Sequence, residues 1–201
     1  MLERESQLQQ LAAAFARVAS GQTGMCAVVS GEAGIGKTSL VQAFARSLPA
    51  ATQVLQCGCE ALFTPRPFGP WLDIATHLPP AVERALLRAP GAGSPFTELF
   101  QFFRGTRGAR VLIVEDVHWA DVGTLDLLHF LGRRLGELRL LLVLTHRDDA
   151  LDSDHPLQRV LGHLPASTTA RLPLPPLSAQ AVHSLARAAR RNGAELYAAT
   201  G

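Results

Sequence analysis

The residues best suited to chemistry lie in one short stretch, residues 31–38, which fits the pattern G-x-x-x-x-G-K-[ST]. An apolar run at residues 25–29 precedes this stretch, and a helical pattern begins at Ser39. A strand that ends in a glycine-rich turn leaves several backbone N–H groups facing one concavity, and the next helix adds the positive end of its dipole. The pattern therefore predicts a loop that binds a polyphosphate.

This phosphate loop supplies most of the residues that we expect to contact a nucleotide. Lys37 would reach the β- and γ-phosphates, and the Thr38 hydroxyl would bind Mg²⁺. The residues predicted to bind the nucleotide here are Gly31, Glu32, Ala33, Gly34, Ile35, Gly36, Lys37, Thr38 and Ser39. The alternative is a structural turn without a ligand, but the apolar strand before the loop and the helical pattern behind it favour phosphate binding.

Two acidic side chains, Glu115 and Asp116, directly follow the apolar run at residues 111–114. In folds with a phosphate loop, a strand of this kind places carboxylates beside the phosphates. Glu115 would hold Mg²⁺ through water, while Asp116 would contribute to the metal site and orient or deprotonate the attacking water. Ordinary turn residues or a helix cap are the alternative for an acidic pair considered alone.

A second set of polar side chains follows the apolar run at residues 140–144. The carboxyl ends of strands in an open parallel sheet face the ligand, so we expect Thr145 and Arg147 close to the γ-phosphate. Arg147 would stabilise charge there or report whether that phosphate is present. A surface salt bridge from Arg147 to Asp148 or Asp149 is an equally good interpretation.

Three residues just after the acidic pair have structural interpretations. His118 suggests a general base, but we assign it no catalytic role because phosphoryl transfer to water relies mainly on positioning and electrostatics. Trp119 is predicted to pack beneath the following helix, in preference to stacking on a base, and Asp121 to cap that helix.

Alternating strand and helix patterns supply the scaffold that must position these residues. Strands are expected at residues 25–29, 53–57, 111–114, 140–144 and 170–174. Helices are expected at residues 5–20, from 39 onward, at 96–103 and at 125–135, with short surface helices at 71–78 and 82–87. Repeated βαβ units predict an α/β fold of the P-loop NTPase type, with a largely parallel five-stranded sheet between helices.

A proline cluster after the fifth strand marks a predicted domain boundary. Residues 1–174 would form the nucleotide-binding α/β domain. Ser178 can cap a further helix that carries Val182, Leu185 and Ala189. Residues 175–201 would thus be the beginning of a helical lid subdomain, which we expect to be incomplete.

Composition limits the class of protein further. An apolar content of 47% predicts a globular core, and a net charge of +2 is too small to indicate nucleic-acid binding. No apolar run approaches the roughly 20 residues needed to cross a bilayer, and the start lacks the features of a signal peptide. We therefore expect a cytoplasmic protein with no membrane partner. Three cysteines, an odd number, argue against a disulfide framework.

The motifs together resemble the ATPase module of STAND proteins, the signal transduction ATPases with numerous domains. The resemblance is greatest to the module of large LuxR-type transcriptional regulators, also catalogued as an AAA-type or origin-recognition-like ATPase domain. The matching segments are residues 32–38 (EAGIGKT), 59–60 with 64–70 (CE, TPRPFGP), 115–121 (EDVHWAD) and 145–149 (THRDD). They extend over nearly the whole chain.

The resemblance implies a switch that holds ATP or ADP with Mg²⁺. Such a switch is closed with ADP and self-assembles with ATP after an inducer acts on another domain. It also implies that Arg4 and Glu5 lie near the adenine and that Arg147 fills the strand-end arginine position. Members of the group carry their DNA-binding helices in later domains, so we expect no direct DNA binding from residues 1–201.

The order Glu115-Asp116 predicts slow turnover, because many remodelling ATPases place the longer glutamate second, where it reaches the water. The predicted function is Mg·ATP binding with slow hydrolysis, as the nucleotide switch of a signal-responsive transcriptional regulator. One alternative is an active remodelling ATPase or a kinase with the same loop. Another is a non-catalytic interaction fragment.

Overall fold

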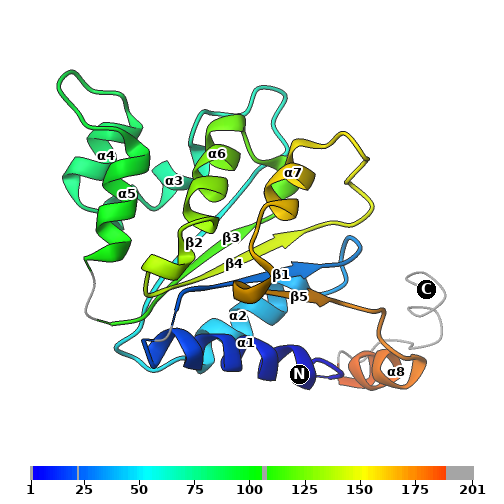
Figure 1. The fold of residues 1–201 in the computed structure, drawn as a ribbon. Helices are drawn as coiled ribbons and strands as arrows, with labels where there is room; N and C mark the ends of the chain where they lie inside the picture. Colours follow the sequence, from blue (N-terminus) through cyan, green and yellow to red (C-terminus); the bar gives the residue numbers. More distant parts are fainter. Residues whose placement is uncertain (1, 22, 106–107, 189–201) are drawn as a thin grey trace.

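Five parallel strands form one sheet in the order β2-β3-β4-β1-β5, as Figure 1 shows. The computed structural model describes residues 2–21, 23–105 and 108–188. The strands are β1 (Met25–Ser30), β2 (Gln53–Gly58), β3 (Arg110–Glu115), β4 (Leu140–His146) and β5 (Thr169–Pro173). Each of the four strand pairings is parallel, which confirms the predicted sheet.

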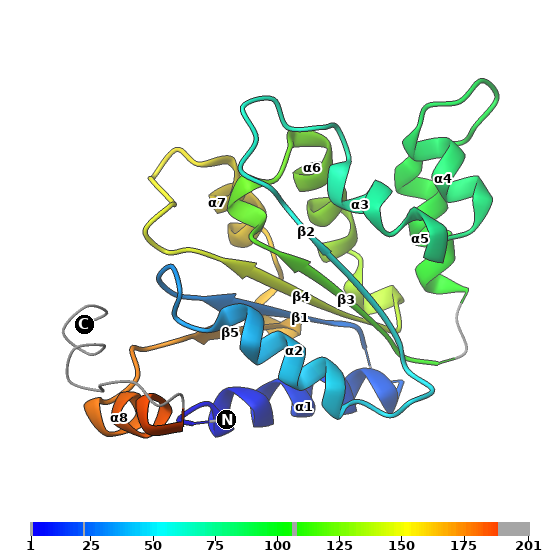
Figure 2. The ribbon, with the colours of Figure 1, turned by 180° about the vertical axis from the view of Figure 1, so that it is seen from behind.

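Helices cover both faces of this sheet (Figures 1 and 2). The α-helices are α1 (Glu5–Ala19), α2 (Lys37–Ser47), α3 (Gly69–Asp73), α4 (Pro80–Leu86), α5 (Pro95–Arg104), α6 (Val122–Gly132), α7 (Pro156–Gly162) and α8 (Ala179–Ala188). Short 3-10 turns are η1 (Ala75–His77), η2 (Val117–Trp119), η3 (Leu135–Glu137) and η4 (Ala166–Thr168). Helices α1 and α2 lie on one face, while α6 and α7 lie on the other.

The alternation of side chains along each strand separates two apolar cores. Val143 belongs to the core that α1 and α2 close with residues such as Leu11 and Phe44. Leu142 faces the other way and joins the core formed with Trp71 and Leu128. Every residue of β4 is buried, as expected for a parallel strand covered on both faces. Burying one such Leu or Phe side chain contributes roughly 1.5–3 kcal/mol, so the two cores stabilise the sheet from both faces.

Three local predictions need correction. Helix α2 begins at Lys37 instead of Ser39, which places Lys37 in its first turn. The segment around Trp71 is not a surface crossover, because that indole is fully buried in the core. Helix α7 was not expected, since a seven-residue helix has too few turns to show a periodic pattern.

The end of the described chain is helix α8, which lies beside the amino-terminal end of α1 (Figures 1 and 2). Ser178 caps it as predicted, because its Oγ accepts a hydrogen bond from the Ala181 N–H at 3.2 Å. Ala189, also predicted for this helix, lies outside the described residues. The boundary at residue 174 therefore stays a prediction.

The described helices give no candidate for a membrane-spanning segment, since none is both long and apolar enough. All three cysteines, Cys26, Cys57 and Cys59, are buried with free thiols. Burial raises the pKa of Cys26 and that of Cys59 to about 12.

These buried thiols predict slow reaction with a disulfide reagent at pH 8, because only the exposed thiolate attacks. Titration of the folded protein with dithionitrobenzoate should release almost no thionitrobenzoate within minutes, and unfolding in guanidinium should release three equivalents. Ser153→Cys, at an exposed turn, provides the control and should react at once. Rapid reaction of the unaltered folded chain would contradict the packing described above.

Candidate functional site

The phosphate loop connects the carboxyl end of β1 to the first turn of α2. Gly36 caps α2 with φ of 100°, and Gly34 has φ of 74°, so both adopt a backbone conformation that other residues rarely enter. A Cβ atom at either position would meet no atom within 4 Å. The two glycines are therefore required by the path of the backbone, and the space above them is open.

The backbone N–H groups of this loop are largely free of partners inside the protein. Within residues 31–38, all of which are described, the one bond from backbone to backbone runs from the Ile35 N–H to the Glu32 carbonyl at 3.4 Å. The next N–H to be satisfied is that of Leu40, which donates to the Gly36 carbonyl at 2.9 Å. The loop is thus neither collapsed nor closed on itself, and its amides suit an anion.

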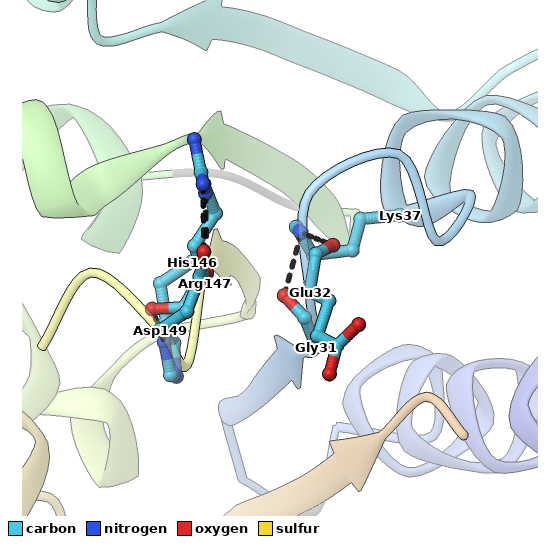
Figure 3. Close-up of polar contacts among 6 residues, drawn as sticks. All are labelled: Gly31, Glu32, Lys37, His146, Arg147 and Asp149. Carbon is cyan, nitrogen blue, oxygen red and sulfur yellow. Dashed lines mark hydrogen bonds and ion pairs between the residues drawn. The ribbon is translucent and has the colours of Figure 1, made fainter. Parts of the chain in front are cut away.

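Lys37 lies across the loop, as Figure 3 shows. Its Nζ donates to the Gly31 carbonyl at 2.8 Å and to the Glu32 carbonyl at 2.7 Å. Lys37 is only 7% exposed, and burial lowers the pKa of its ammonium, an effect that the negative charge of Asp116 opposes. A phosphate would give this ammonium a charged acceptor in place of neutral carbonyls, which makes a stronger hydrogen bond.

Glu115 ends β3, and the neighbouring strand β2 orients its carboxylate. Gln56 Nε2 donates to Glu115 Oε1 at 2.7 Å, while Oε2 is buried without a partner among the described residues. Mg²⁺ in such sites takes one or two carboxylates together with phosphate oxygens and water. The free oxygen of Glu115, with the exposed Thr38 in the first turn of α2, fits that set. Sequence reasoning missed Gln56, whose only signal was a polar residue in the neighbouring strand.

Asp116 and Thr145 are joined directly. The Asp116 N–H donates to Thr145 Oγ1 at 2.9 Å, and Asp116 has a left-handed backbone with φ of 54°. Thr145 is buried at the end of β4, so its hydroxyl fixes the turn that carries the carboxylate. The structure therefore brings Lys37, Asp116 and Thr145 to one edge of the sheet, although the role of Thr145 at a phosphate stays a prediction.

Arg147 is paired with Asp149 in this structure (Figure 3). Its Nε and one terminal nitrogen donate to the two carboxylate oxygens at 3.2 and 2.7 Å. This hydrogen bonding raises the pKa of Arg147 and lowers that of Asp149. The salt bridge, one of the two alternatives for Arg147, is thus formed here, and contact with a γ-phosphate stays a prediction.

Arg4 lies beside the phosphate loop and connects it to the segment after β5. It is 2% exposed, and its guanidinium donates to the carbonyls of Ile35 at 3.3 Å and Pro175 at 2.9 Å. Burial lowers its pKa. Next to it, the Glu3 carboxylate accepts hydrogen bonds from the N–H, at 2.8 Å, and the hydroxyl of Ser178. The predicted contact of Arg4 with adenine is not tested by these bonds.

The turn after the acidic pair agrees with one prediction and contradicts another. Asp121 caps α6, because its Oδ1 accepts from the Thr124 N–H at 3.1 Å. It also accepts from the Phe68 N–H at 3.0 Å, a contact that the sequence did not indicate. Trp119 was wrongly expected beneath α6: it is 44% exposed and its ring centre lies 5.1 Å from that of His118.

Three solved structures share this fold. The Aeropyrum pernix ORC1 protein in complex with DNA has a TM-score of 0.60 and 22% identity, covering 94% of this chain and 49% of that chain. Drosophila ORC bound to DNA has a TM-score of 0.54 and 19% identity, and the match covers 92% of this chain and 45% of that chain. The Thermotoga maritima RuvB Holliday junction branch migration motor has a TM-score of 0.50 and 17% identity, covering 92% and 50%. These likenesses establish the fold, and the chain spans about half the length of these structures.

No curated protein matches the chain. The sequence profile of the AAA ATPase domain family, however, matches residues 1–144, which is more than half of the chain. The match includes the phosphate loop, the acidic end of β3 and all but the last two residues of β4. This chain therefore belongs to the AAA ATPase domain family.

Proposed function

We propose that this AAA ATPase domain binds Mg·ATP and hydrolyses it slowly, as the nucleotide switch of a signal-responsive transcriptional regulator in the cytoplasm. The observation that carries the proposal is the open phosphate loop, with Lys37 across it and Asp116 close enough to influence the pKa of that lysine. The regulatory setting rests on the resemblance to the modules of LuxR-type regulators, which extends to residues 59–70 and 115–121.

Binding depends on groups that already face the loop. The loop amides and Lys37 would hold the β- and γ-phosphates, while Thr38, and Glu115 through water, would hold Mg²⁺. Bound Mg²⁺ would neutralise charge that develops on the phosphate oxygens. Gln56 holds one carboxylate oxygen of Glu115, which leaves the other oxygen without a partner among the described residues and available for Mg²⁺.

Slow hydrolysis follows from the length and fixation of Asp116. This carboxylate would orient or accept a proton from the attacking water. Its side chain is one methylene shorter than that of a glutamate, and the bond from its N–H to Thr145 holds the backbone in place. The Asp116 carboxylate would therefore reach less far toward the attacking water than a glutamate carboxylate would.

The switch would use contacts that differ between ATP and ADP. Arg147 is bound to Asp149 at the surface here, and a γ-phosphate offers it a more highly charged partner. Arg4 joins the phosphate loop to Pro175, so a change in the loop would reach the segment that leads to α8. Self-assembly in the ATP-bound state is part of the same proposal. It requires that ATP bind the assembling conformation more tightly than the closed one, and that ADP do the reverse.

Replacing Lys37 with alanine should abolish measurable binding. The loss of two charge-assisted hydrogen bonds to phosphate predicts at least about a 100-fold rise in the Kd for ATP in calorimetry. Arg46→Ala removes one positive charge from the exposed side of the same helix and should leave the Kd within about twofold. Equal affinities for Lys37→Ala and the unaltered protein would refute the role of the loop.

Lys37 is the only lysine of the chain, which allows a test without mutation. Mass spectrometry assigns any acylated ε-amine to this residue, while the terminal α-amine serves as an internal reference. ATP and ADP should slow acetylation of Lys37 about tenfold or more, because the β-phosphate would bind the ε-ammonium group and shield it from the reagent. AMP, which lacks that phosphate, should not protect it. If AMP protected Lys37 and ATP and ADP did not, the nucleotide would not bind with its β-phosphate at Lys37.

Hydrolysis should be slow and dependent on Asp116. Many enzymes turn over at roughly 1–1,000 per second, and we expect less than about 0.1 per second in a single-turnover assay with ATP and Mg²⁺. Asp116→Asn should lower that rate about 100-fold or more while the Kd stays within about threefold. Asp116→Glu, with the longer side chain, should raise it. Hydrolysis by the unaltered protein at more than about 1 per second would contradict this prediction.

A further inference from the structure

His118 is a buried histidine whose ring has no hydrogen-bond partner. The residue lies in η2 directly after the acidic pair and is 5% exposed. Neither Nδ1 nor Nε2 bonds to any of the described residues. A neutral imidazole carries one N–H donor and one acceptor nitrogen, and both are removed from water here.

Leaving such groups without partners destabilises the folded protein, because the cost of removing each group from water is not recovered. A side chain that only filled space would avoid this penalty, as a phenylalanine of similar shape would. Buried polar groups without partners therefore call for a ligand, a catalytic role or a water. The position of His118 in the fold favours a ligand among these three explanations.

The surroundings of His118 connect it to the candidate site. Burial lowers the pKa of its ring, and the charges that act on the ring belong to Asp116, Arg147, Lys37 and His146. The first three of these are the groups assigned above to the γ-phosphate end of the nucleotide. His118 also follows Asp116 by two residues, in the turn at the carboxyl end of β3, so it lies at the same edge of the sheet as the phosphate loop.

The backbone around His118 is held from two sides, which limits how the ring can move. Its carbonyl oxygen lies 3.1 Å from His155 Nε2, at the start of α7. Two residues earlier, the Asp116 N–H is bound to Thr145 at the end of β4. The centre of the ring lies 5.1 Å from that of Trp119. A turn held by both β4 and α7 presents its side chain in a defined place.

We propose that His118 contacts the γ-phosphate of bound ATP, with one ring N–H donating a hydrogen bond to a γ-phosphate oxygen. This inference rests on the proposed function and deepens it, because it adds a second group, besides Arg147, that distinguishes ATP from ADP. The role is binding and positioning, and no proton is transferred. ADP has no γ-phosphate, so the ring stays unpartnered in that state.

The test compares nucleotide affinity with stability for His118→Phe. Kd values for ATP, for its β,γ-imido analogue and for ADP, all with Mg²⁺, are measured by calorimetry. We expect the Kd for both triphosphates to rise about 10- to 100-fold, as for a lost hydrogen bond to a charged group, and the Kd for ADP to change less than about twofold. The Tm of the free variant should stay the same or rise, because two unsatisfied groups are removed.

A conservative variant and a distant histidine serve as controls. His118→Gln keeps an N–H donor at nearly the reach of Nε2 and should restore part of the triphosphate affinity, which also decides the matter if the phenylalanine variant does not fold. His129→Phe makes the same chemical change on α6, where the ring is bonded to His163 at 3.2 Å. It should leave the affinities for ATP and ADP unaltered.

The outcomes separate this inference from the proposed function. If the unaltered protein binds neither nucleotide, the proposed function fails and the inference fails with it. If the unaltered protein binds ATP and both His118 variants bind ATP and ADP as it does, the inference alone is overturned. A fall in Tm for His118→Phe with unaltered affinities would identify the ring as a packing residue.

Discussion

The burial of a parallel sheet on both faces is the constraint from which the rest of this structure follows. Because apolar side chains occupy the two faces of β1, β3 and β4, polar side chains that could contact a ligand are confined to the ends of these strands. Parallel strands end at the same edge. The order β2-β3-β4-β1-β5 then brings the phosphate loop after β1, the acidic pair at the end of β3 and Thr145 in β4 to one edge of the sheet. The packing of the core therefore determines which segments of the chain meet at the candidate site.

Three groups at this edge have neutral partners. Lys37 bonds to two carbonyls, Glu115 to an amide side chain and Asp116 through its N–H to a hydroxyl. A phosphate or a metal ion offers each charged group a stronger, charged partner without demanding a new backbone arrangement. These bonds exist before any ligand is present, which supports the site that we propose.

The unsatisfied ring of His118 and the free oxygen of Glu115 lie in the same part of the fold. Each lowers the stability of the empty protein, and each gains a partner in the liganded site that we propose. Such polar groups are often retained where function requires them, at the expense of stability. By contrast, Arg4 already donates to the carbonyls of Glu3, Ile35 and Pro175, and so joins segments that lie 171 residues apart. The first two side chains are suited to ligand contact, and Arg4 is suited to transmitting movement of the loop.

The sequence by itself determined the local elements: the phosphate loop, the five strands, most helices and the caps at Asp121 and Ser178. These depend on residue patterns that bias the neighbouring backbone, and so they can be read locally. Tertiary structure alone decided the order of the strands, the pairing of Gln56 with Glu115 and the exposure of Trp119. These features depend on contacts between segments far apart in the chain, and such contacts form only when both cores pack.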